Sequence, residues 1–347
     1  MRLPPLLTRA GEGVIIFGIT VYSEELMYRI GIDLGGTNIA GGLVDDGNGF
    51  LIAEKASVST GASRSSEEIA ADIASLCRRL CDMHGMSLSD VAAIGIATPG
   101  IAESATGIVR YSCNLPFRNF PIADTMRQAT GVEDVRIEND ANAAAWGEAV
   151  AGAAKGTHNS VMITLGTGVG GGIIIDDRIY SGFNGAGAEL GHMVIEYGGK
   201  RCSCGRRGCW EAYSSATAVI SMTKDKLAEC DREGRATVMG DLILKKGKIS
   251  GVTAFDAMRL GDPAGKEIVD MYIGYLACGL TNIVNIFQPE VISLGGGISN
   301  EGQSLIDALL PLVGREQYGG GIVKQTELRI AKLGNDAGII GAAALSI

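Results

Sequence analysis

The sequence predicts an α/β protein composed of two related domains that face each other. Three observations support this prediction: an internal repeat, an alternation of strand and helix patterns, and a length of 347 residues, which suits two domains of about 100–200 residues each. In the repeat, residues 32–46 (IDLGGTNIAGGLVDD) align without a gap with residues 163–177 (ITLGTGVGGGIIIDD). Each segment reads as a strand, a glycine-rich turn, a second strand and an Asp-containing turn.

A weaker similarity relates IGIATPGI at 94–101 to VISLGGGI at 291–298. Glycine-rich hairpins can resemble each other by chance, because glycine turns between strands are common. The gapless alignment favours an ancient duplication instead. We therefore expect two α/β domains of common origin.

Strand and helix patterns alternate around these hairpins. Ile69, Ile73, Leu76 and Leu80 fall on one helical face, and Pro263 suits the first turn of a long apolar helix. Further expected strands are 91–97, 135–138 and 291–294, and the other expected helices are 140–152, 263–287 and 337–346. Strands that alternate with helices indicate sheets covered by helices.

The first 26 residues do not fit this pattern. Their apolar run from 14 to 21 is interrupted by Gly18 and Thr20 and is shorter than the roughly 18 residues of a membrane span. Glu12 before the run and the lack of an A-x-A site argue against a secretory signal. We expect residues 1–26 to be an N-terminal extension, either disordered or the product of a misassigned start.

The rest of the chain is expected to form a small α/β domain (27–140 plus about 330–347) and a large one (141–329). A formal net charge of −9 disfavours nucleic acid as a partner. Eight cysteines could indicate disulfides, but three of them stand at metal-ligand spacing, which suits a reducing compartment. We therefore expect a cytoplasmic protein with no membrane partner.

Three glycine clusters suggest a phosphate-binding site. Backbone N–H groups at glycines can approach a phosphate closely, a Thr hydroxyl can join them, and an Asp at a strand end can hold Mg²⁺ through water. The residues concerned are Asp33, Gly35, Gly36 and Thr37 in the first hairpin, Gly166, Thr167 and Gly168 in the second, and Gly296 in a third cluster where a nucleoside could lie. Each cluster alone is a weak signal, because most such turns are structural.

The segment Glu138-Asn139-Asp140-Ala141-Asn142 stands where an expected strand ends and a helix begins. Asp140 or Asn139 could simply be the helix N-cap. Alternatively, Asp140 could be a general base that accepts the proton of a sugar hydroxyl and aligns it for in-line attack on the γ-phosphate. Asn139 would then bind neighbouring hydroxyls.

The most specific pattern is a set of soft metal ligands. His192, Cys202, Cys204 and Cys209 can complete a tetrahedral zinc shell. No ligand is missing from this set, so the expected zinc is structural and forms a knuckle in the large domain. Glu189 and Glu211 flank the motif. They could accept hydrogen bonds from sugar hydroxyls, or they could be solvated surface charges.

Taken together, these segments resemble the ROK family of repressors and sugar kinases, from about Met27 to the C-terminus. The matching stretches are IGIDLGGTNIAGGLVD, IGIATPGI, IENDANAAAWGE, LGTGVGGGII, GAGAELGHM and CSCGRRGCWE, and their occurrence in this order is highly specific. The resemblance implies the two-domain actin-like (ribonuclease H-like) sugar-kinase fold with an interdomain cleft. One departure is Asn38, where many members have Lys, which puts one phosphate contact in doubt.

The resemblance also implies roles for individual residues. Asp140 would be the catalytic base, and His192 would contact the sugar as well as zinc. The other implied sugar contacts are Asn114, Asn139, Glu189 and Glu211, and the ATP site would be lined by Gly35, Thr37, Gly166, Thr167 and Gly296. The Asn-Leu-Pro-Phe loop at Asn114 is similar to the loops of glucokinases, which commonly have an aromatic residue after Asn-Leu-Pro.

The implied activity is ATP-dependent phosphorylation of a hexose at its 6-hydroxyl, with glucose as the first candidate. The expected cofactors are ATP, Mg²⁺ and structural Zn²⁺, and the expected assembly is a homo-oligomer, a dimer or a tetramer. An N-acylhexosamine kinase, acting on N-acetylglucosamine or N-acetylmannosamine, is the alternative enzyme. A sugar-responsive transcription regulator is disfavoured, because only 26 residues precede Met27 and they show no pair of helix patterns.

Overall fold

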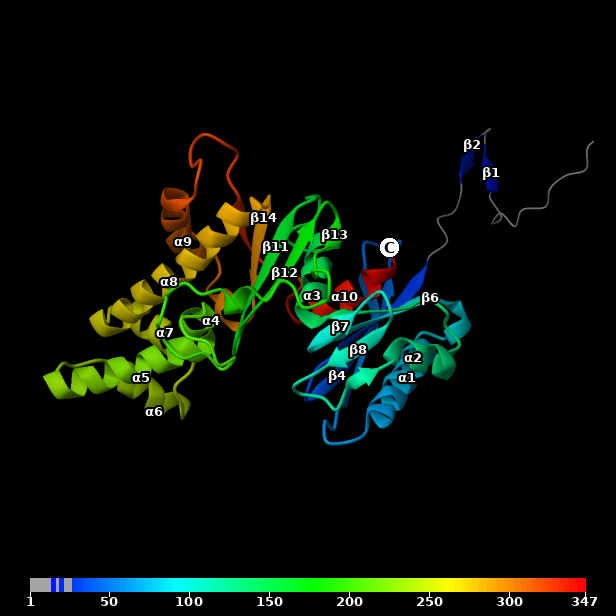
Figure 1. Cartoon of the computed structure of the whole chain (residues 1–347), viewed down its shortest axis with the longest axis horizontal. Coiled ribbons are helices and arrows are strands. Elements are labelled where there is room, and N and C mark those ends of the chain that lie inside the picture. Colours follow the sequence, from blue (N-terminus) through cyan, green and yellow to red (C-terminus); the bar gives the residue numbers. More distant parts are fainter. Residues whose placement is uncertain (1–13, 17–18, 22–26) are drawn as a thin grey trace, which may run out of the picture.

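The computed structural model describes residues 14–16, 19–21 and 27–347 (Figure 1). β1 (Val14–Ile16) and β2 (Ile19–Val21) form an antiparallel pair that joins neither of the two large sheets. Most of the extension expected at residues 1–26 lies outside the described residues.

The first large sheet has the strand order β10-β6-β3-β4-β5. β3 runs parallel to β6 and β6 parallel to β10, whereas β4 is antiparallel to both β3 and β5. The strands are β3 (Tyr28–Leu34), β4 (Asn38–Asp45), β5 (Leu51–Ser59), β6 (Val91–Thr98) and β10 (Val135–Asn139). α1 (Ser66–Met83) and α2 (Ile122–Thr130) cover one face, and their apolar side chains form a common core with the sheet.

The second large sheet repeats this arrangement with the order β13-β12-β11-β14-β15. β11 is antiparallel to β12 and parallel to β14, and β14 is parallel to β15. The strands are β11 (Ser160–Leu165), β12 (Val169–Ile175), β13 (Arg178–Ile179), β14 (Val291–Gly295) and β15 (Glu327–Ile330). β3 therefore corresponds to β11, β4 to β12 and β6 to β14, which are the segments that the sequence repeat aligns.

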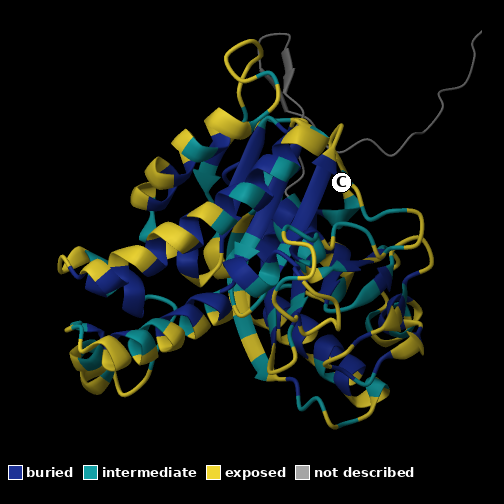
Figure 2. Ribbon diagram, turned by 60° about the vertical axis from the view of Figure 1, so that its left-hand side comes forward, coloured by how far each residue is buried: buried dark blue, intermediate teal, exposed yellow. Residues whose placement is uncertain are grey.

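Helices cover the second sheet as well (Figure 2). Its strands β11, β12 and β14 are mostly buried, whereas β13 and most of β15 are partly exposed. The helices are α4 (Glu211–Ser214), α5 (Ala216–Glu233), α6 (Met239–Lys246), α7 (Thr253–Arg259), α8 (Pro263–Phe287) and α9 (Gln303–Glu316). α8 has the bounds that its sequence pattern predicts, because Asp262 caps it and Pro263 occupies its first position. Among the described residues, no helix is both long and apolar enough to span a membrane.

Two helices lie between the sheets, and each crosses from one half of the repeat to the other (Figure 1). α3 (Asp140–Val150) follows the last strand of the first sheet but packs on β11 and β12. α10 (Ala337–Ala343) follows the last strand of the second sheet but packs on β3 and β6. The two helices touch closely, since a Cβ on Gly341 would lie 1.7 Å from the Ala143 carbonyl oxygen.

The sequence analysis differs from the structure in a few elements. The helix expected at 337–346 is α-helical only to Ala343 and continues as a 3₁₀ turn, Ala344–Ser346. A three-stranded sheet was not predicted, because its strands have three or four residues and show no clear alternation. These strands are β7 (Ile101–Glu103), β8 (Ile108–Tyr111) and β9 (Arg118–Phe120).

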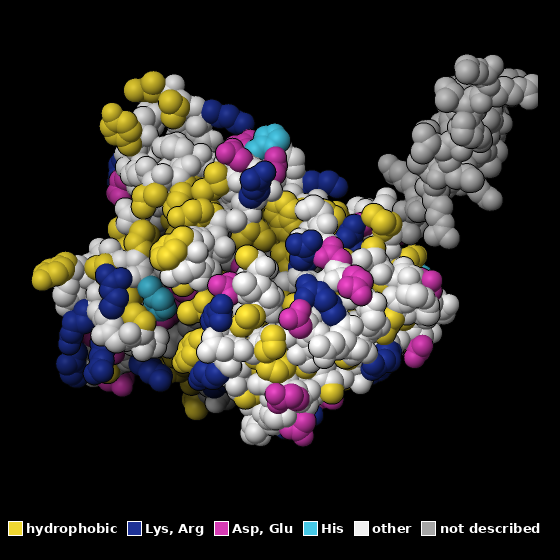
Figure 3. Space-filling view, turned by 45° about the vertical axis from the view of Figure 1, so that its right-hand side comes forward, with side chains coloured by type: hydrophobic (Ala, Val, Ile, Leu, Met, Phe, Trp, Pro, Cys, Tyr) yellow, Lys and Arg dark blue, Asp and Glu magenta, His cyan; other side chains and the backbone are white. Residues whose placement is uncertain are grey.

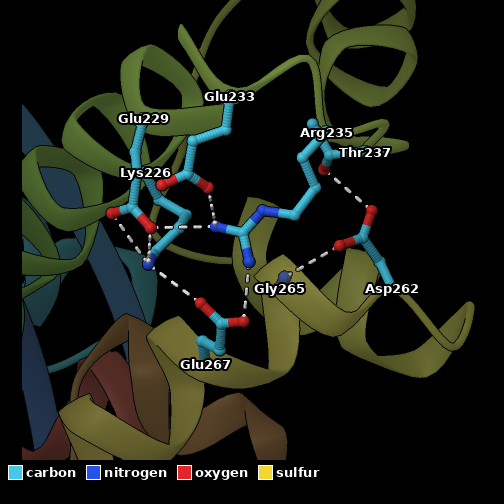
Figure 4. Close-up of polar contacts among 8 residues, drawn as sticks. All are labelled: Lys226, Glu229, Glu233, Arg235, Thr237, Asp262, Gly265 and Glu267. Atoms are coloured by element: carbon cyan, nitrogen blue, oxygen red, sulfur yellow. Dashed lines mark hydrogen bonds and ion pairs between the residues drawn. The ribbon is translucent and has the colours of Figure 1, made fainter. Parts of the chain in front are cut away.

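A polar network joins α5 to α8 in the second half of the chain (Figure 4). Lys226 and Arg235 each pair with both Glu229 and Glu267 at 2.9 Å. Beside this network, Asp262 is a buried carboxylate that pairs with no cation among the residues that the structure describes. It accepts hydrogen bonds from the Gly265 N–H (3.0 Å), the Thr237 hydroxyl (2.8 Å) and the Val238 N–H (2.6 Å).

The Asp262→Asn variant should be less stable by about 1–3 kcal/mol at pH 7, because one of its two acceptor oxygens becomes a donor that faces donors. Burial acts to raise the pKa of Asp262, but the three hydrogen bonds outweigh burial and lower it. The stability that they provide is therefore complete above the unfolded pKa of about 3.9 and is lost as the pH falls through the lower folded pKa. Urea unfolding at pH 7 and pH 3 would test this prediction. If wild type and variant differed in free energy of unfolding by the same amount at both pH values, the prediction would be contradicted.

The face of the molecule shown in Figure 3 carries both signs of charge. In its right-hand part, Lys and Arg side chains alternate with Asp and Glu side chains and form no single basic field.

Candidate active site

A cleft of about 880 Å³ lies between the two sheets and is lined from both halves of the repeat. The first sheet contributes Asp33 and Lys55, the second contributes Met162 and Thr164, and α3 contributes Asp140. The cleft includes four of the predicted site residues: Asp33, Gly35, Asp140 and Gly296. The other predicted site residues do not line it, and their positions follow from separate contacts.

The first glycine turn joins β3 to β4 at the mouth of this cleft. Its shape is held by Thr60, whose hydroxyl donates to the Gly35 carbonyl (2.7 Å) and whose N–H donates to the Thr37 carbonyl (2.9 Å). Gly36 and Thr37 remain exposed. A Cβ on Gly36 would lie 3.5 Å from the Cβ of Asn114, so the structure brings the predicted sugar loop beside the predicted phosphate turn.

Asp33 is the last residue but one of β3 and lines the cleft. Gly338 of α10 makes room for it, because a Cβ there would lie 2.9 Å from Asp33 Oδ2. The pKa of Asp33 is raised to about 6, first by burial and then by the charge on Asp140, whereas the charge on Lys55 acts to lower it. Lys55 pairs with Asp336 beside the cleft.

Asn139, and not Asp140, is the N-cap of α3. Its side-chain oxygen accepts the N–H groups of Ala141 (2.9 Å) and Asn142 (3.2 Å), and its amide donates to the Gly100 carbonyl (3.1 Å). Asp140 is the first helical residue, and its carboxylate accepts the Ala141 N–H (2.9 Å). The capping role therefore leaves most of the hydrogen-bonding capacity of Asp140 free.

The carboxylate of Asp140 is open to the solvent of the cleft. Enclosure by the surrounding protein raises its pKa, backbone N–H groups oppose this effect, and the charge on Glu189 adds to it. A carboxyl group whose pKa is raised is a better proton acceptor than an ordinary Asp. Glu189 precedes the 3₁₀ turn Leu190–His192, and its carbonyl accepts the His192 N–H at 3.0 Å.

The sequence analysis assigned no role to Glu138, which is only 4% exposed. Its carboxylate accepts the Ser104 hydroxyl (2.8 Å), the Asn142 amide (3.0 Å) and the Asn139 N–H (2.9 Å). Glu138 thereby fixes the junction of β10 and α3. The sequence feature that could have indicated this role is an acidic residue near the end of the apolar strand β10.

The second glycine turn joins β11 to β12 and is bound to the metal knuckle through Glu211. Glu211 Oε2 accepts the Val169 N–H at 3.1 Å, and its other oxygen accepts the Ser203 hydroxyl at 3.2 Å. A Cβ on Gly168 would lie 2.3 Å from Glu211 Oε2. A side chain at 168 would therefore displace this carboxylate from its place. The remaining carbonyls of the turn, on Gly166 and Thr167, accept hydrogen bonds from the start of α5.

The four predicted metal ligands meet in one cluster. Ligand atoms of His192, Cys202, Cys204 and Cys209 all lie within 4.8 Å of one another. The Cys204 and Cys209 sulfurs are 3.7 Å apart, and the Cys202 sulfur is 3.7 Å from His192 Nδ1. Two thiolates bound to one zinc at about 2.3 Å in a tetrahedron would be about 3.8 Å apart. The donor set therefore fits a tetrahedral metal.

The ROK family model matches residues 29–347. The chain belongs to the ROK family. It is 36% identical to a glucokinase of Thermotoga maritima over 321 residues (91% of this chain and 96% of the relative) and 35% identical to a glucokinase of Halalkalibacterium halodurans over 316 residues (90% and 93%). The crystal structure of a ROK family glucokinase from Streptomyces griseus with glucose and AMPPNP is 33% identical, with a TM-score of 0.73, covering 92% of this chain and 98% of the other.

These comparisons confirm the resemblance inferred from the six sequence motifs. They also confirm the two-domain actin-like fold, since ROK sugar kinases with this fold are the structural neighbours. The duplicated sheets and the cleft between them are the features that define this fold in the chain itself.

Proposed function

We propose that this protein is a glucokinase, which transfers the γ-phosphoryl group of ATP to the 6-hydroxyl of glucose. The observation that carries the proposal is Asp140, a carboxylate with a raised pKa that opens into the cleft lined also by Gly35 of the first glycine turn and by Gly296. Phosphoryl transfer needs positioning and charge stabilisation more than covalent chemistry by the protein. The glucokinase relatives, aligned over nine-tenths of the chain, support the same reaction.

In this proposal, Asp140 accepts the proton of the sugar hydroxyl as the oxygen attacks the γ-phosphorus. Mg²⁺ would neutralise phosphate charge, and Asp33 would hold it through water. The glycine turns would cradle the nucleotide; the residues concerned are Gly35, Gly36, Thr37, Gly166, Thr167, Gly168 and Gly296. Gly296 lines the cleft with a φ of 82°, a conformation that glycine adopts without strain.

The sugar would lie on the other side of Asp140, held by Asn114, Asn139, Glu189, His192 and Glu211. Two observations support this placement: Asn114 lies beside Gly36, and the charge on Glu189 acts to raise the pKa of Asp140. Asn139 uses its oxygen as the helix cap and donates one amide hydrogen to the Gly100 carbonyl, so only its second amide hydrogen would be available to the sugar. Glu211 would face the sugar from the junction of the second turn and the knuckle.

We also propose that the four-residue cluster holds a structural zinc ion. Three thiolates and an imidazole are the soft ligands that zinc takes in closed structural sites. Bound zinc would hold the knuckle as a rigid support for Glu211 and the second turn. The homo-oligomer, a dimer or a tetramer, stays a prediction.

A coupled assay of the purified protein with MgATP and a panel of hexoses would test the function. We expect the highest kcat/KM with glucose and release of glucose 6-phosphate. A higher kcat/KM with N-acetylglucosamine or N-acetylmannosamine would replace glucokinase by the alternative kinase. No phosphorylation of any sugar would refute the proposal.

A further inference from the structure

Glu148 is a fully buried carboxylate in α3 that the proposed mechanism does not use. Its Oε2 accepts the backbone N–H groups of Ala153 (2.6 Å) and Lys332 (3.1 Å), and its Oε1 accepts the N–H of Leu333 (2.8 Å). No cation pairs with it in the described part of the chain. A buried carboxylate is costly unless it is fully hydrogen-bonded, so these three donors define its role.

The partners of Glu148 come from two segments far apart in the sequence. Ala153 lies just after α3, whereas Lys332 and Leu333 connect β15 to α10. Gly152 leaves the space that the carboxylate needs, because a Cβ there would lie 2.1 Å from Glu148 Oε2. One side chain of α3 therefore holds the connection that leads from β15 into α10.

Both segments that Glu148 connects reach the cleft. α3 begins with Asp140, and Glu148 lies eight residues later in the same helix, about 12 Å along its axis. Lys332 is itself part of the cleft wall, together with Ile330, Ala331, Gly334 and Asn335. The helix that carries the proposed base is thus bonded directly to the wall beside the proposed nucleotide.

We propose that Glu148 is a positioning residue for phosphoryl transfer, which sets the part of the cleft wall around Lys332 relative to the helix that carries Asp140. The inference rests on the proposed placement of ATP in the cleft. Only a carboxylate can fill the role, because both of its oxygens accept backbone N–H groups. In a Gln side chain, the NH₂ group would replace one oxygen and would face an N–H donor without an acceptor. A displacement of about 1 Å between reacting groups can cost about 10²-fold in rate.

The test is the Glu148→Gln variant, compared with Asp262→Asn. Asp262 is also buried, has three hydrogen-bond donors and, in the part of the chain that the structure describes, no cation, and it lies outside the cleft lining. We expect Glu148→Gln to lower kcat/KM for ATP by about 10–100-fold and to weaken the affinity for AMPPNP, measured by calorimetry. The affinity for glucose should change less than about threefold. Asp262→Asn should lose stability with all of these constants near wild type.

Equal kinetic and AMPPNP-binding constants in the two variants would overturn the inference, because they would show that Glu148 only stabilises the fold. Should Glu148→Gln fail to fold, Glu148→Asp keeps the charge but retracts it, and it should still weaken AMPPNP binding more than glucose binding. AMPPNP calorimetry does not depend on turnover. A wild-type protein that binds AMPPNP but phosphorylates no hexose would therefore refute the proposed function and leave this inference to be judged by binding alone.

Discussion

The Asp140→Asn variant should fold normally and bind glucose, but its kcat should fall by at least about 10²–10⁴-fold. Asn has nearly the same shape as Asp and cannot accept the proton of the sugar hydroxyl. The fold should tolerate the change because the helix cap is Asn139, and not Asp140. Steady-state kinetics with MgATP and calorimetry with glucose would separate turnover from binding.

The same variant should also lower the pKa of Asp33, the other carboxylate of the cleft. The charge on Asp140 is, after burial, the main reason why the pKa of Asp33 is raised to about 6. Removing that charge should bring the pKa of Asp33 closer to the ordinary Asp value of about 3.9. In the wild type, both carboxylates have raised pKa values, so the acidic limb of kcat/KM should lie above pH 4 and should move to lower pH in the variant.

The matched control for Asp140→Asn is Asn139→Ala. Loss of this cap should cost about 1 kcal/mol of stability and raise KM for glucose, while the base remains in place. A kcat that is near normal in Asp140→Asn would show that the carboxylate has no role in proton transfer. A loss of glucose binding as large as the loss of kcat would point to a sugar contact instead.

The sequence predicts those features of the fold that depend on residues close together in the chain. The two aligned segments become equivalent hairpins, because each contains its own strands and its own glycine turn. Helix α8 begins where expected, since Asp262 and Pro263 form its cap and first turn. The metal cluster could also be predicted, because three of its four ligands lie within eight residues.

Features that depend on distant backbone groups could not be predicted. Glu148 appears in the sequence as one acid in an alanine-rich helix, and its partner Lys332 N–H lies 184 residues away. The crossing of α3 and α10 depends on glycines whose importance shows only when the opposing helix is present. Gly168 carried a phosphate-turn signal, whereas its missing side chain is explained by the carboxylate of Glu211.

The Cys204→Ser variant should lose the zinc ion that we propose for the knuckle. Metal analysis of the wild type should give one zinc per chain, and the variant should retain little, because a serine hydroxyl is a poor replacement for a thiolate. Stability should fall with the metal, since a closed site links binding to folding. Cys278→Ser provides a control, because Cys278 lies outside the cluster and its loss should leave the zinc in place.

The loss of zinc should also reach the sugar site through Glu211. This carboxylate is held by the Ser203 hydroxyl within the knuckle and accepts the Val169 N–H of the second turn. A disordered knuckle would release Glu211 and the Val169 N–H that it holds. We therefore expect kcat/KM for glucose to fall by about 10–100-fold, the range typical of losing a residue that supports a metal site. The affinity for AMPPNP should fall less, because no knuckle residue lines the cleft and the Gly166 and Thr167 carbonyls of the second turn stay bonded to the start of α5. Wild-type protein that contains no zinc after purification without chelators would refute the metal assignment. A variant that loses zinc but keeps its affinity for glucose would instead show that Glu211 is positioned without the knuckle.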